Sequence, residues 1–425
     1  MKVHHLVDRH DSRLKIAVIV KSFPALTETF ILNRITGLIK RGHVVDIYAK
    51  KKRGSDKDTH QALKDYNLLE RTHYEVNFSK SRSNERYLKL KVLLSMLKKS
   101  KGLRGAKYWT DKKFIVQQSR FKRRKEYDLI HAFYGINGLM AMHARTVGIL
   151  EGPISVSFHG FDLSRVVKKN PIAYNQLFQK GDLFLPVCNY YKDKLIKLGC
   201  PIEKIKVHPS SIDINKFLPD PSKRSSKKVK ILSIGRLIEL KGFRYSIQAV
   251  GEFIQENPTI EITYRIIGSG LLKDDLLEEI DSLQLSDKID IREAVNHKKL
   301  VAEIQSSDIL ICPSIVADDG IGDTLPNVLK EAMACELAVI ASDHAGIPEL
   351  VKHRENGFLV PEKDINQIKK AIEVLVNSPE LREELGKQGR RYVQKYYEIE
   401  SKNDIISDIY KELANSYSQV DATLI

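Results

Sequence analysis

Two carboxylates flank the predicted start of a helix in one stretch of this 425-residue chain. Asp323 comes just before Pro326, and Glu331 follows eight positions after Asp323, inside the predicted helix. Proline suits the first helical turn, where its missing N–H costs nothing. Carboxylates accept hydrogen bonds from the hydroxyls of a ribose or a hexose, and the free N–H groups of a helix start favour a phosphate. The spacing therefore predicts a site for the ribose, diphosphate and sugar of a sugar nucleotide.

Two cations and a glycine follow other predicted strands of the same half of the chain. Arg236 and Lys241 come after the apolar run 229–234, and Gly268 comes after the run 261–267. An arginine and a lysine together neutralise a diphosphate, the first through paired N–H donors and the second as a point charge. Gly268 lets backbone approach a ligand closely, although a single Gly-x-Gly is weak support.

These residues need a parallel sheet to bring them together, and the sequence predicts two such sheets. Apolar runs alternate with helical segments, at 14–20, 44–49, 128–133, 154–158 and 183–187 and then at 229–234, 261–267, 289–291, 308–311 and 338–340. This alternation is typical of βαβ units, whose ligands bind at the carboxyl ends of the strands. We expect an α/β fold of two doubly wound Rossmann-like domains facing a central cleft. A polar run with two prolines near 218–228 separates residues 1–215 from residues 216–395, and a final helix, 396–425, is expected to cross back to the N-terminal domain.

The segment 80–125 carries most of the chain's positive charge. It holds 17 of the Lys and Arg residues and two acids, an excess of 15 in a chain of net charge +16. Apolar residues are interleaved with the cations, which is typical of a basic amphipathic helix that binds anionic lipid. The alternative is a solvated helix whose apolar stripe packs on its own domain. No recognition-helix or zinc-knuckle pattern favours nucleic acid.

Composition narrows the class of protein further. Cys188, Cys200, Cys312 and Cys335 lack metal-ligand spacing and are expected to be buried free thiols. The N-terminus has no signal-peptide pattern, and no run reaches the length of a membrane-spanning helix. We expect a cytoplasmic protein that can associate peripherally with the inner face of the cell membrane.

Taken together, the sequence resembles the retaining GT-B glycosyltransferases of family 4, and most of all the bacterial members that build lipopolysaccharide and exopolysaccharide. The resemblance covers nearly the whole chain outside 80–125. It is carried by the segments 22–31, 158–162, 235–242, 319–334, 344–351 and 356–360.

The resemblance implies roles for matching positions. Arg236 and Lys241 would stabilise the leaving diphosphate, Glu331 would hold the ribose, and Asp323 would lie near the transferred sugar as the first acid of the family's E-x7-E motif. His159 would line the reaction centre. The nucleotide sugar would also be contacted by Gly268, Thr324, Leu325 and Asn327, and Thr27 and Glu28 are further candidates for donor or acceptor contacts.

The resemblance also implies a mechanism, which is retention without a metal or cofactor. The one Asp-x-Asp, at 56–58, lies in a lysine-rich loop, and no positioned nucleophile is visible. The expected partners are a UDP- or GDP-sugar and a saccharide or lipid-linked acceptor.

Three positions depart from the family pattern. Asp323 is one methylene shorter than the usual Glu, Thr324 replaces a common Gly, and Glu293 stands near the expected base. Two alternatives therefore stay open: another enzyme on the same scaffold, such as an epimerase or phosphorylase, and a catalytically weak partner subunit.

Overall fold

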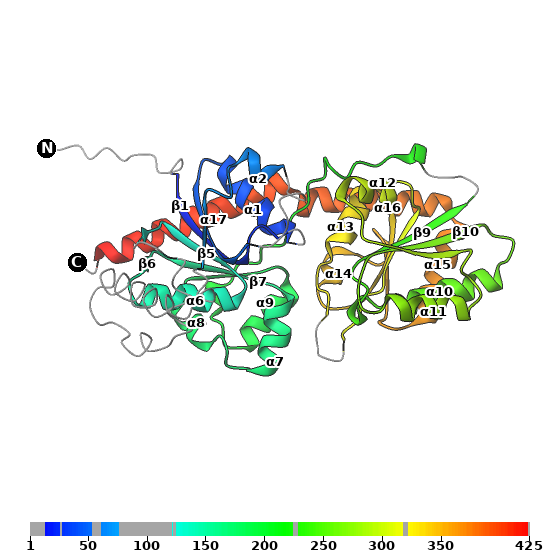
Figure 1. Cartoon of the computed structure of the whole chain (residues 1–425), viewed down its shortest axis with the longest axis horizontal. Coiled ribbons are helices and arrows are strands. Elements are labelled where there is room, and N and C mark those ends of the chain that lie inside the picture. Colours follow the sequence, from blue (N-terminus) through cyan, green and yellow to red (C-terminus); the bar gives the residue numbers. More distant parts are fainter. Residues whose placement is uncertain are drawn as a thin grey trace, which may run out of the picture.

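Two parallel six-stranded sheets form the frame of the molecule (Figure 1). The computed structural model describes residues 13–25, 28–52, 61–75, 121, 125–223, 228–317 and 322–423. Both sheets have the strand order 3-2-1-4-5-6 within their own domain, which places a topological switch point between the first and fourth strands. The predicted two-domain α/β architecture is confirmed.

The N-terminal sheet is built around buried apolar strands, three of which are buried at every residue. Its order is β3 (Thr72–Tyr74), β2 (Val44–Lys51), β1 (Lys15–Ser22), β5 (Leu129–Phe133), β7 (Ile154–Phe158) and β8 (Leu183–Pro186). Successive residues of β1 point to opposite faces. Ile16 and Val18 therefore pack with α1 (Thr29–Lys40), whereas Ala17 and Ile19 pack with α6 (Gly135–Thr146). A two-stranded pair, β4 (Lys125–Glu126) and β6 (Leu150–Glu151), and the helices α2 (Ala62–Asp65), α7 (Val167–Lys169), α8 (Asn175–Lys180) and α9 (Asn189–Lys197) complete this domain.

The second sheet repeats the arrangement. Its order is β11 (Ile289–Arg292), β10 (Ile262–Ile267), β9 (Val229–Ile234), β12 (Ile309–Cys312), β13 (Ala338–Ser342) and β14 (Phe358–Val360). Its helices are α10 (Phe243–Glu256), α11 (Lys273–Ser282), α12 (His297–Gln305), α13 (Asn327–Ala334), α14 (Ile347–Leu350), α15 (Ile365–Asn377) and α16 (Pro379–Tyr397). The core of this domain also takes in Ile212, Ile214 and Phe217, so it begins a few residues before the predicted boundary at 216.

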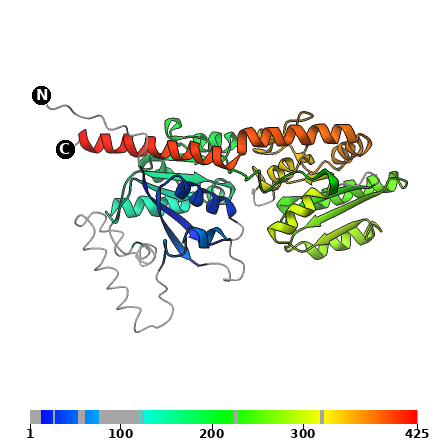
Figure 2. The same cartoon turned by 90° about the horizontal axis from the view of Figure 1, so that it is seen from above.

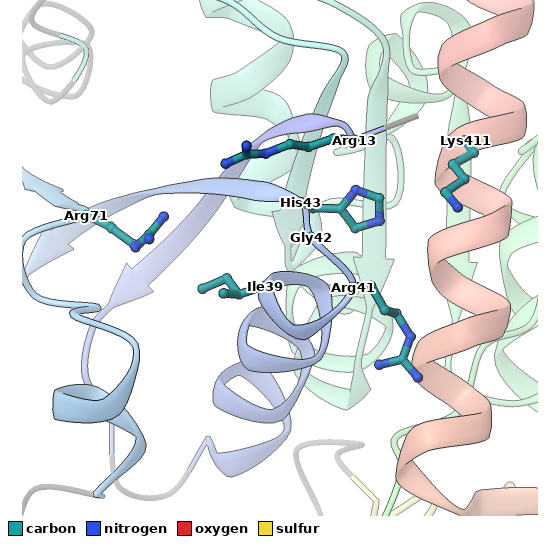
Figure 3. A pocket seen from close by; sticks show the side chains of 7 residues that line it. All are labelled: Arg13, Ile39, Arg41, Gly42, His43, Arg71 and Lys411. Carbon is teal, nitrogen blue, oxygen red and sulfur yellow. The ribbon is translucent and has the colours of Figure 1, made fainter. Parts of the chain in front are cut away.

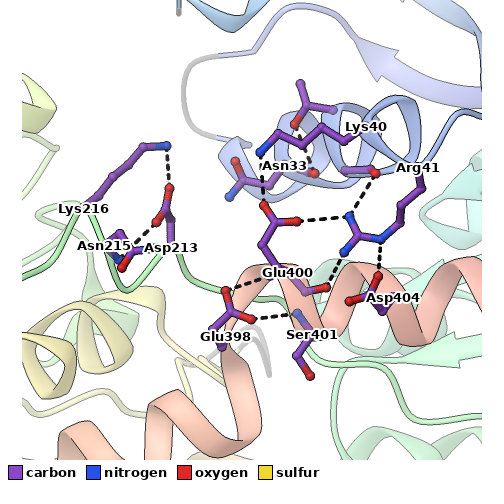
Figure 4. Close-up of polar contacts among 12 residues, drawn as sticks. Asn33, Lys40, Arg41, Asp213, Asn215, Lys216, Glu398, Glu400, Ser401 and Asp404 are labelled. Carbon is purple, nitrogen blue, oxygen red and sulfur yellow. Dashed lines mark hydrogen bonds and ion pairs between the residues drawn. The ribbon is translucent and has the colours of Figure 1, made fainter.

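The last two helices connect the domains. α16 packs on α13 in the second domain, and α17 (Ile399–Thr423) lies along the N-terminal domain against α1. α16 and α17 thus follow one another across both domains (Figure 2). Ion pairs fix α17 to the end of α1 (Figure 4): Glu400 meets Lys40 at 3.1 Å and Arg41 at 3.2 Å, and Arg41 meets Asp404 at 2.7 Å. The predicted C-terminal segment 396–425 thus contains a helix that packs on the N-terminal domain.

Several sequence predictions concern residues outside the described ranges. The basic segment 80–125, apart from Phe121 and Lys125, and the acids at 56–58 are among them. The four cysteines are buried free thiols, as expected. Within the described part of the chain, no helix has both the length and the apolar character needed to cross a membrane.

Candidate functional site

The loop before α13 brings the predicted lysine and the first predicted carboxylate into contact. Lys241 Nζ forms an ion pair with Asp323 Oδ2, and Ser314 Oγ donates to the same oxygen at 2.9 Å. Both side chains are mostly buried, with 15% and 23% of their surfaces exposed. Burial alone would lower the pKa of Lys241, but Asp323 opposes this and the net pKa is raised. Lys241 is therefore a fixed cation beside the start of α13.

Arg236 lies at the end of β9, where the prediction places it, and its side chain is exposed. It is close enough to Lys241 that its positive charge lowers the pKa of that lysine. Gly268, at the end of β10, packs so tightly that a Cβ atom there would come within 1.8 Å of the Gly235 carbonyl oxygen. The missing side chain of Gly268 thus lets the end of β10 pack directly against the end of β9 and the loop that carries Arg236.

Glu331 sits in the middle of α13 and is partly exposed. Among the described residues no side chain or backbone group donates a hydrogen bond to it, and burial raises its pKa to about 7. The neighbouring Lys330 opposes that shift. A carboxyl group held without a partner is suited to accept hydrogen bonds from ligand hydroxyls.

His159 follows β7 in the N-terminal domain and has a buried Nε2 atom with no hydrogen-bond partner. Its ring packs against Phe30 and Tyr134, with ring centres 4.7 Å and 5.1 Å away. Burial, followed by the charges of Arg34 and Lys330, lowers its pKa to about 3, so the imidazole is neutral. Asp162 fixes the loop, because its carboxylate accepts from the His159 N–H at 3.3 Å.

Asp162 also joins this loop to the start of α6. Its Oδ1 atom accepts from the Gly135 N–H at 3.0 Å and from the Tyr174 hydroxyl at 3.2 Å. Burial raises the pKa of Asp162 to about 7 against the effect of these bonds. The sequence prediction included Asp162 only as part of a motif, and its positioning role was missed.

The two domains touch beside these residues. A Cβ atom on Gly160 would come within 3.7 Å of the Gly322 carbonyl oxygen, so the His159 loop faces the Asp323 loop. Thr324 Oγ1 donates to the Tyr191 hydroxyl across the interface. Leu325 packs on the cores of both domains. Thr324 and Leu325 therefore contact the N-terminal domain in this structure.

Glu349 makes a second contact between the domains. It accepts from the backbone N–H groups of Asn189 and Tyr190, each at 2.9 Å, and from Asn189 Nδ2 at 2.8 Å. These donors lie at the start of α9, where partial positive charge favours a carboxylate. Glu349 was not among the predicted site residues, although the predicted segment 344–351 contains it.

Asn327 and Lys330 are directed towards the chain that links the domains. Asn327 Oδ1 accepts from Ser210 Oγ at 3.3 Å, and Lys330 Nζ donates to Ser210 O at 2.8 Å and to Ser210 Oγ at 2.7 Å. Lys330 is fully buried over the Tyr397 ring, and burial lowers its pKa to about 7. No feature of the sequence distinguishes this lysine from a solvated one.

Three further residues complete the surroundings. His344 lies against Gly322, and its Nδ1 atom is 2.8 Å from Glu362 Oε1. Its buried Nε2 atom has no hydrogen-bond partner among the described residues. The sequence analysis did not name His344 as a site residue. Glu28 accepts from the Tyr134 hydroxyl at 2.9 Å, whereas Thr27 lies outside the described residues. Glu293 is exposed and pairs with Lys273 and Ser269 beyond the end of β11.

The arrangement can neutralise a diphosphate and hold hydroxyl groups on either side of it. Lys241 and Arg236 supply positive charge, Glu331 supplies a free acceptor, and His159 supplies a neutral polar atom from the opposite domain. Within the described ranges, no three His, Cys, Asp or Glu side chains gather as a metal site would require.

Comparisons with known proteins identify the family and the fold of the chain. The family model "Glycosyltransferase Family 4" matches residues 27–216, and "Glycosyl transferases group 1" matches residues 215–392. The putative colanic acid biosynthesis glycosyltransferase WcaL of Escherichia coli is 32% identical over 359 residues, which cover 83% of this chain and 88% of that protein. The amylovoran biosynthesis glycosyltransferase AmsK of Erwinia amylovora is 31% identical over 83% of this chain and 88% of its own.

Solved structures with low sequence identity share the fold. HepE of Anabaena, crystallised with UDP, superposes with a TM-score of 0.70 at 17% identity, covering 94% of this chain and all of that one. Sucrose-phosphate synthase from Thermosynechococcus elongatus gives the same TM-score at 17% identity over 95% of this chain. The chain therefore belongs to the glycosyltransferases that the group 1 and family 4 models describe, and it is a transferase of GT-B architecture.

Proposed function

We propose that this enzyme transfers a sugar from a nucleotide-sugar donor to a saccharide or lipid-linked saccharide, with retention at the anomeric carbon and without a metal ion. The observation that carries the proposal is the position of Lys241. It is a buried cation held by Asp323 beside the start of α13, with Arg236 at the same strand end. A diphosphate placed there gains both cations and the free N–H groups of the helix start.

Each part of the donor then has a partner. Glu331 accepts from the ribose hydroxyls, Arg236 and Lys241 hold the diphosphate, and the sugar extends towards His159. Because the His159 imidazole is neutral, its Nε2 atom forms a hydrogen bond with a sugar hydroxyl and does not act as a charged acid. This orientation places the anomeric carbon between the two domains, where the Gly160 and Gly322 backbones approach each other.

The reaction needs no protein nucleophile in this arrangement. The acceptor hydroxyl attacks the anomeric carbon on the face from which the diphosphate leaves. The bond from carbon to diphosphate oxygen breaks, its electron pair stays on that oxygen, and the departing diphosphate takes the hydroxyl proton. Arg236 and Lys241 stabilise the negative charge that develops, a contribution worth about 3–4 kcal/mol for one well-placed donor in other enzymes.

The acceptor and the cellular role are inferred from relatives. WcaL and AmsK are named for colanic acid and amylovoran biosynthesis, and another relative, 25% identical over 71% of this chain, is named for galactosyl transfer to a diphosphoundecaprenol-linked sugar. We accordingly assign the chain to cell-surface polysaccharide synthesis at the cytoplasmic face of the membrane. The excess of cations in the segment 80–125 supports attraction to an anionic membrane surface.

A donor screen tests the proposal. The purified protein is heated with a panel of UDP-, GDP- and ADP-sugars, and a true donor should raise the melting temperature because it binds only the folded state. Arg236→Gln and Lys241→Gln should each abolish most of that rise. A panel in which no nucleotide sugar stabilises the wild-type protein, or in which both variants respond as the wild type does, would refute the proposed donor site.

A further inference from the structure

A hollow of about 460 Å³ lies at the opposite edge of the N-terminal sheet from the reaction centre. Arg13 precedes β1, Gly42 and His43 precede β2, and Arg71 precedes β3, so the hollow borders the amino ends of these strands. His159 follows the carboxyl end of β7 in the same parallel sheet. The eight residues of β1 separate the two edges by roughly 25 Å.

Cationic side chains make up most of its lining. Arg13, Arg41, Arg71 and Lys411 surround it, together with Ile39, Gly42 and His43 (Figure 3). In Figure 3, Arg13 and Arg71 lie on one side of His43 and Lys411, from α17, lies on the other.

The charge of Arg41 is offset by its neighbours. It pairs with Asp404 at 2.7 Å and with Glu400 at 3.2 Å. By contrast, Arg13 and Arg71 have no acidic partner among the described residues, and Arg13 is exposed. Arg13 and Arg71 therefore keep positive charge at the hollow with which no described carboxylate forms an ion pair.

The imidazole of His43 lies beside these cations. The imidazole is buried and fully engaged, since its Nδ1 atom accepts from the Leu14 N–H at 3.1 Å and its Nε2 atom lies 2.8 Å from Ser407 Oγ. Burial lowers the pKa of His43, and the charges of Lys411 and Arg41 lower it further. The ring is a neutral wall of the hollow and does not compete for an anion.

We propose that this hollow is a second ligand site, which binds the phosphate groups of a phosphorylated molecule. Its volume is within the range of small-molecule pockets, which is about 300–1,000 Å³. Arginine presents paired N–H donors in a fixed fork, and a tetrahedral phosphate accepts such forks from more than one side at once, as the separate positions of Arg13 and Arg71 require. Arg41 adds positive charge only, because its guanidinium already donates to Asp404, Glu400 and two backbone carbonyls. A planar carboxylate accepts only in its own plane and matches this arrangement less well.

The phosphate can come from a soluble molecule or from a lipid headgroup. Lys125, the last residue of the basic segment, lies in β4, three residues before Asp128, whose Oδ2 atom accepts from the Lys15 N–H at 2.7 Å. This end of the basic segment thus lies at the same edge of the sheet as the hollow. A soluble phosphorylated molecule and a lipid headgroup both present a phosphate to the arginines, so the experiment needs one arm for each.

Inorganic pyrophosphate is the probe for the soluble source, and the full chain is used. The His43 ring resonances, assigned by their loss in His43→Gln, should shift as pyrophosphate is added. In Arg13→Gln/Arg71→Gln the apparent dissociation constant should rise about tenfold or more. The matched control Lys180→Gln/Lys197→Gln removes the same charge from exposed positions on the same domain and should stay within about twofold of wild type. Arg13→Gln alone, at an exposed position, provides a milder variant that retains the fold.

The second arm uses phosphatidylcholine vesicles that contain phosphatidylglycerol, in a flotation assay. Vesicle binding that pyrophosphate reverses, and that falls in Arg13→Gln/Arg71→Gln but not in the control, identifies a lipid headgroup as the source. Pyrophosphate binding that is lost in this variant while vesicle binding is unchanged identifies a soluble phosphate. If His43 does not respond to pyrophosphate, or responds with equal affinity in Arg13→Gln/Arg71→Gln, the site does not exist. Neither result depends on donor binding, since Arg236 and Lys241 are unchanged throughout.

Discussion

The carboxyl group of Glu331 predicts a donor affinity that changes with pH. Its pKa is raised to about 7 by burial against the opposing charge of Lys330, and none of the described residues donates a hydrogen bond to it. Ribose hydroxyls bind a carboxylate more strongly than a neutral acid, because the charged acceptor forms the stronger bond. A group with this pKa goes from about one-tenth to about nine-tenths ionised between pH 6 and pH 8, so the affinity should rise by up to about tenfold over that range.

The size of the contribution follows from replacing the carboxylate. Glu331→Gln keeps one acceptor oxygen and removes the charge, so one or two charge-assisted hydrogen bonds of about 1.5–3 kcal/mol are weakened. At pH 8 the dissociation constant for the donor should rise about 10- to 150-fold, and the dependence on pH between 6 and 8 should disappear. The assay is isothermal titration with the nucleotide sugar found in the donor screen, whose substituted diphosphate keeps a constant charge over this range.

Lys330 provides the control for this experiment. Its pKa is also close to 7, so it titrates in the same range and could produce a slope of its own. Lys330→Met should keep a rise in affinity with pH, because this side chain is directed towards Ser210, but the rise should move to higher pH, because Lys330 lowers the pKa of Glu331. A slope that survives in Glu331→Gln, or that is absent from Lys330→Met at higher pH as well, would show that the ribose is held elsewhere.

Three further predictions concern the cation, the interface and the buried lysine. Lys241→Gln should lower kcat/KM by about 100-fold in steady-state assays, and a loss under about threefold would remove Lys241 from the diphosphate site. Glu349→Gln should weaken the contact between the domains by about 1–3 kcal/mol and raise the radius of gyration measured by small-angle scattering, so an unchanged radius would contradict a role for Glu349 in holding the domains together. For Lys330 the folded pKa is below the unfolded one, so unfolding takes up a proton above pH 7. The free energy of unfolding of wild type should therefore rise by about 1.4 kcal/mol per pH unit relative to Lys330→Met between pH 7 and 8.5 in urea titrations. Equal slopes in the two proteins would argue against a neutral buried lysine.

The sequence predicts the sheets well because buried parallel strands are continuous apolar runs. The expected strands at 154–158 and 229–234 match β7 and β9 residue for residue. Two strands of three residues, β3 and β14, were missed, because three residues are too few to show a period. The proximity of Lys241 to the loop of Asp323 also follows from the sequence, since both lie after neighbouring strands at a switch point.

The contacts across the domain interface could not be predicted in this way. Tyr191 meets Thr324 and Asn189 meets Glu349 over more than 130 positions of sequence, and neither pair follows a periodic pattern. Their positions depend on how two rigid domains dock, which local propensity does not encode. The burial of Lys330 has the same origin, because Ser210 and Tyr397 come from the crossing segments between the domains.

The course of α17 has a consequence for how the chain is made. Ile406, Tyr410 and Ala414 of this helix complete the core of the N-terminal domain beneath α1. The domain that emerges first from the ribosome thus lacks one of its walls until residues 399–423 have been synthesised. A fragment ending before residue 399 should expose that apolar face and aggregate, whereas supplying α17 as a separate peptide should restore a soluble domain.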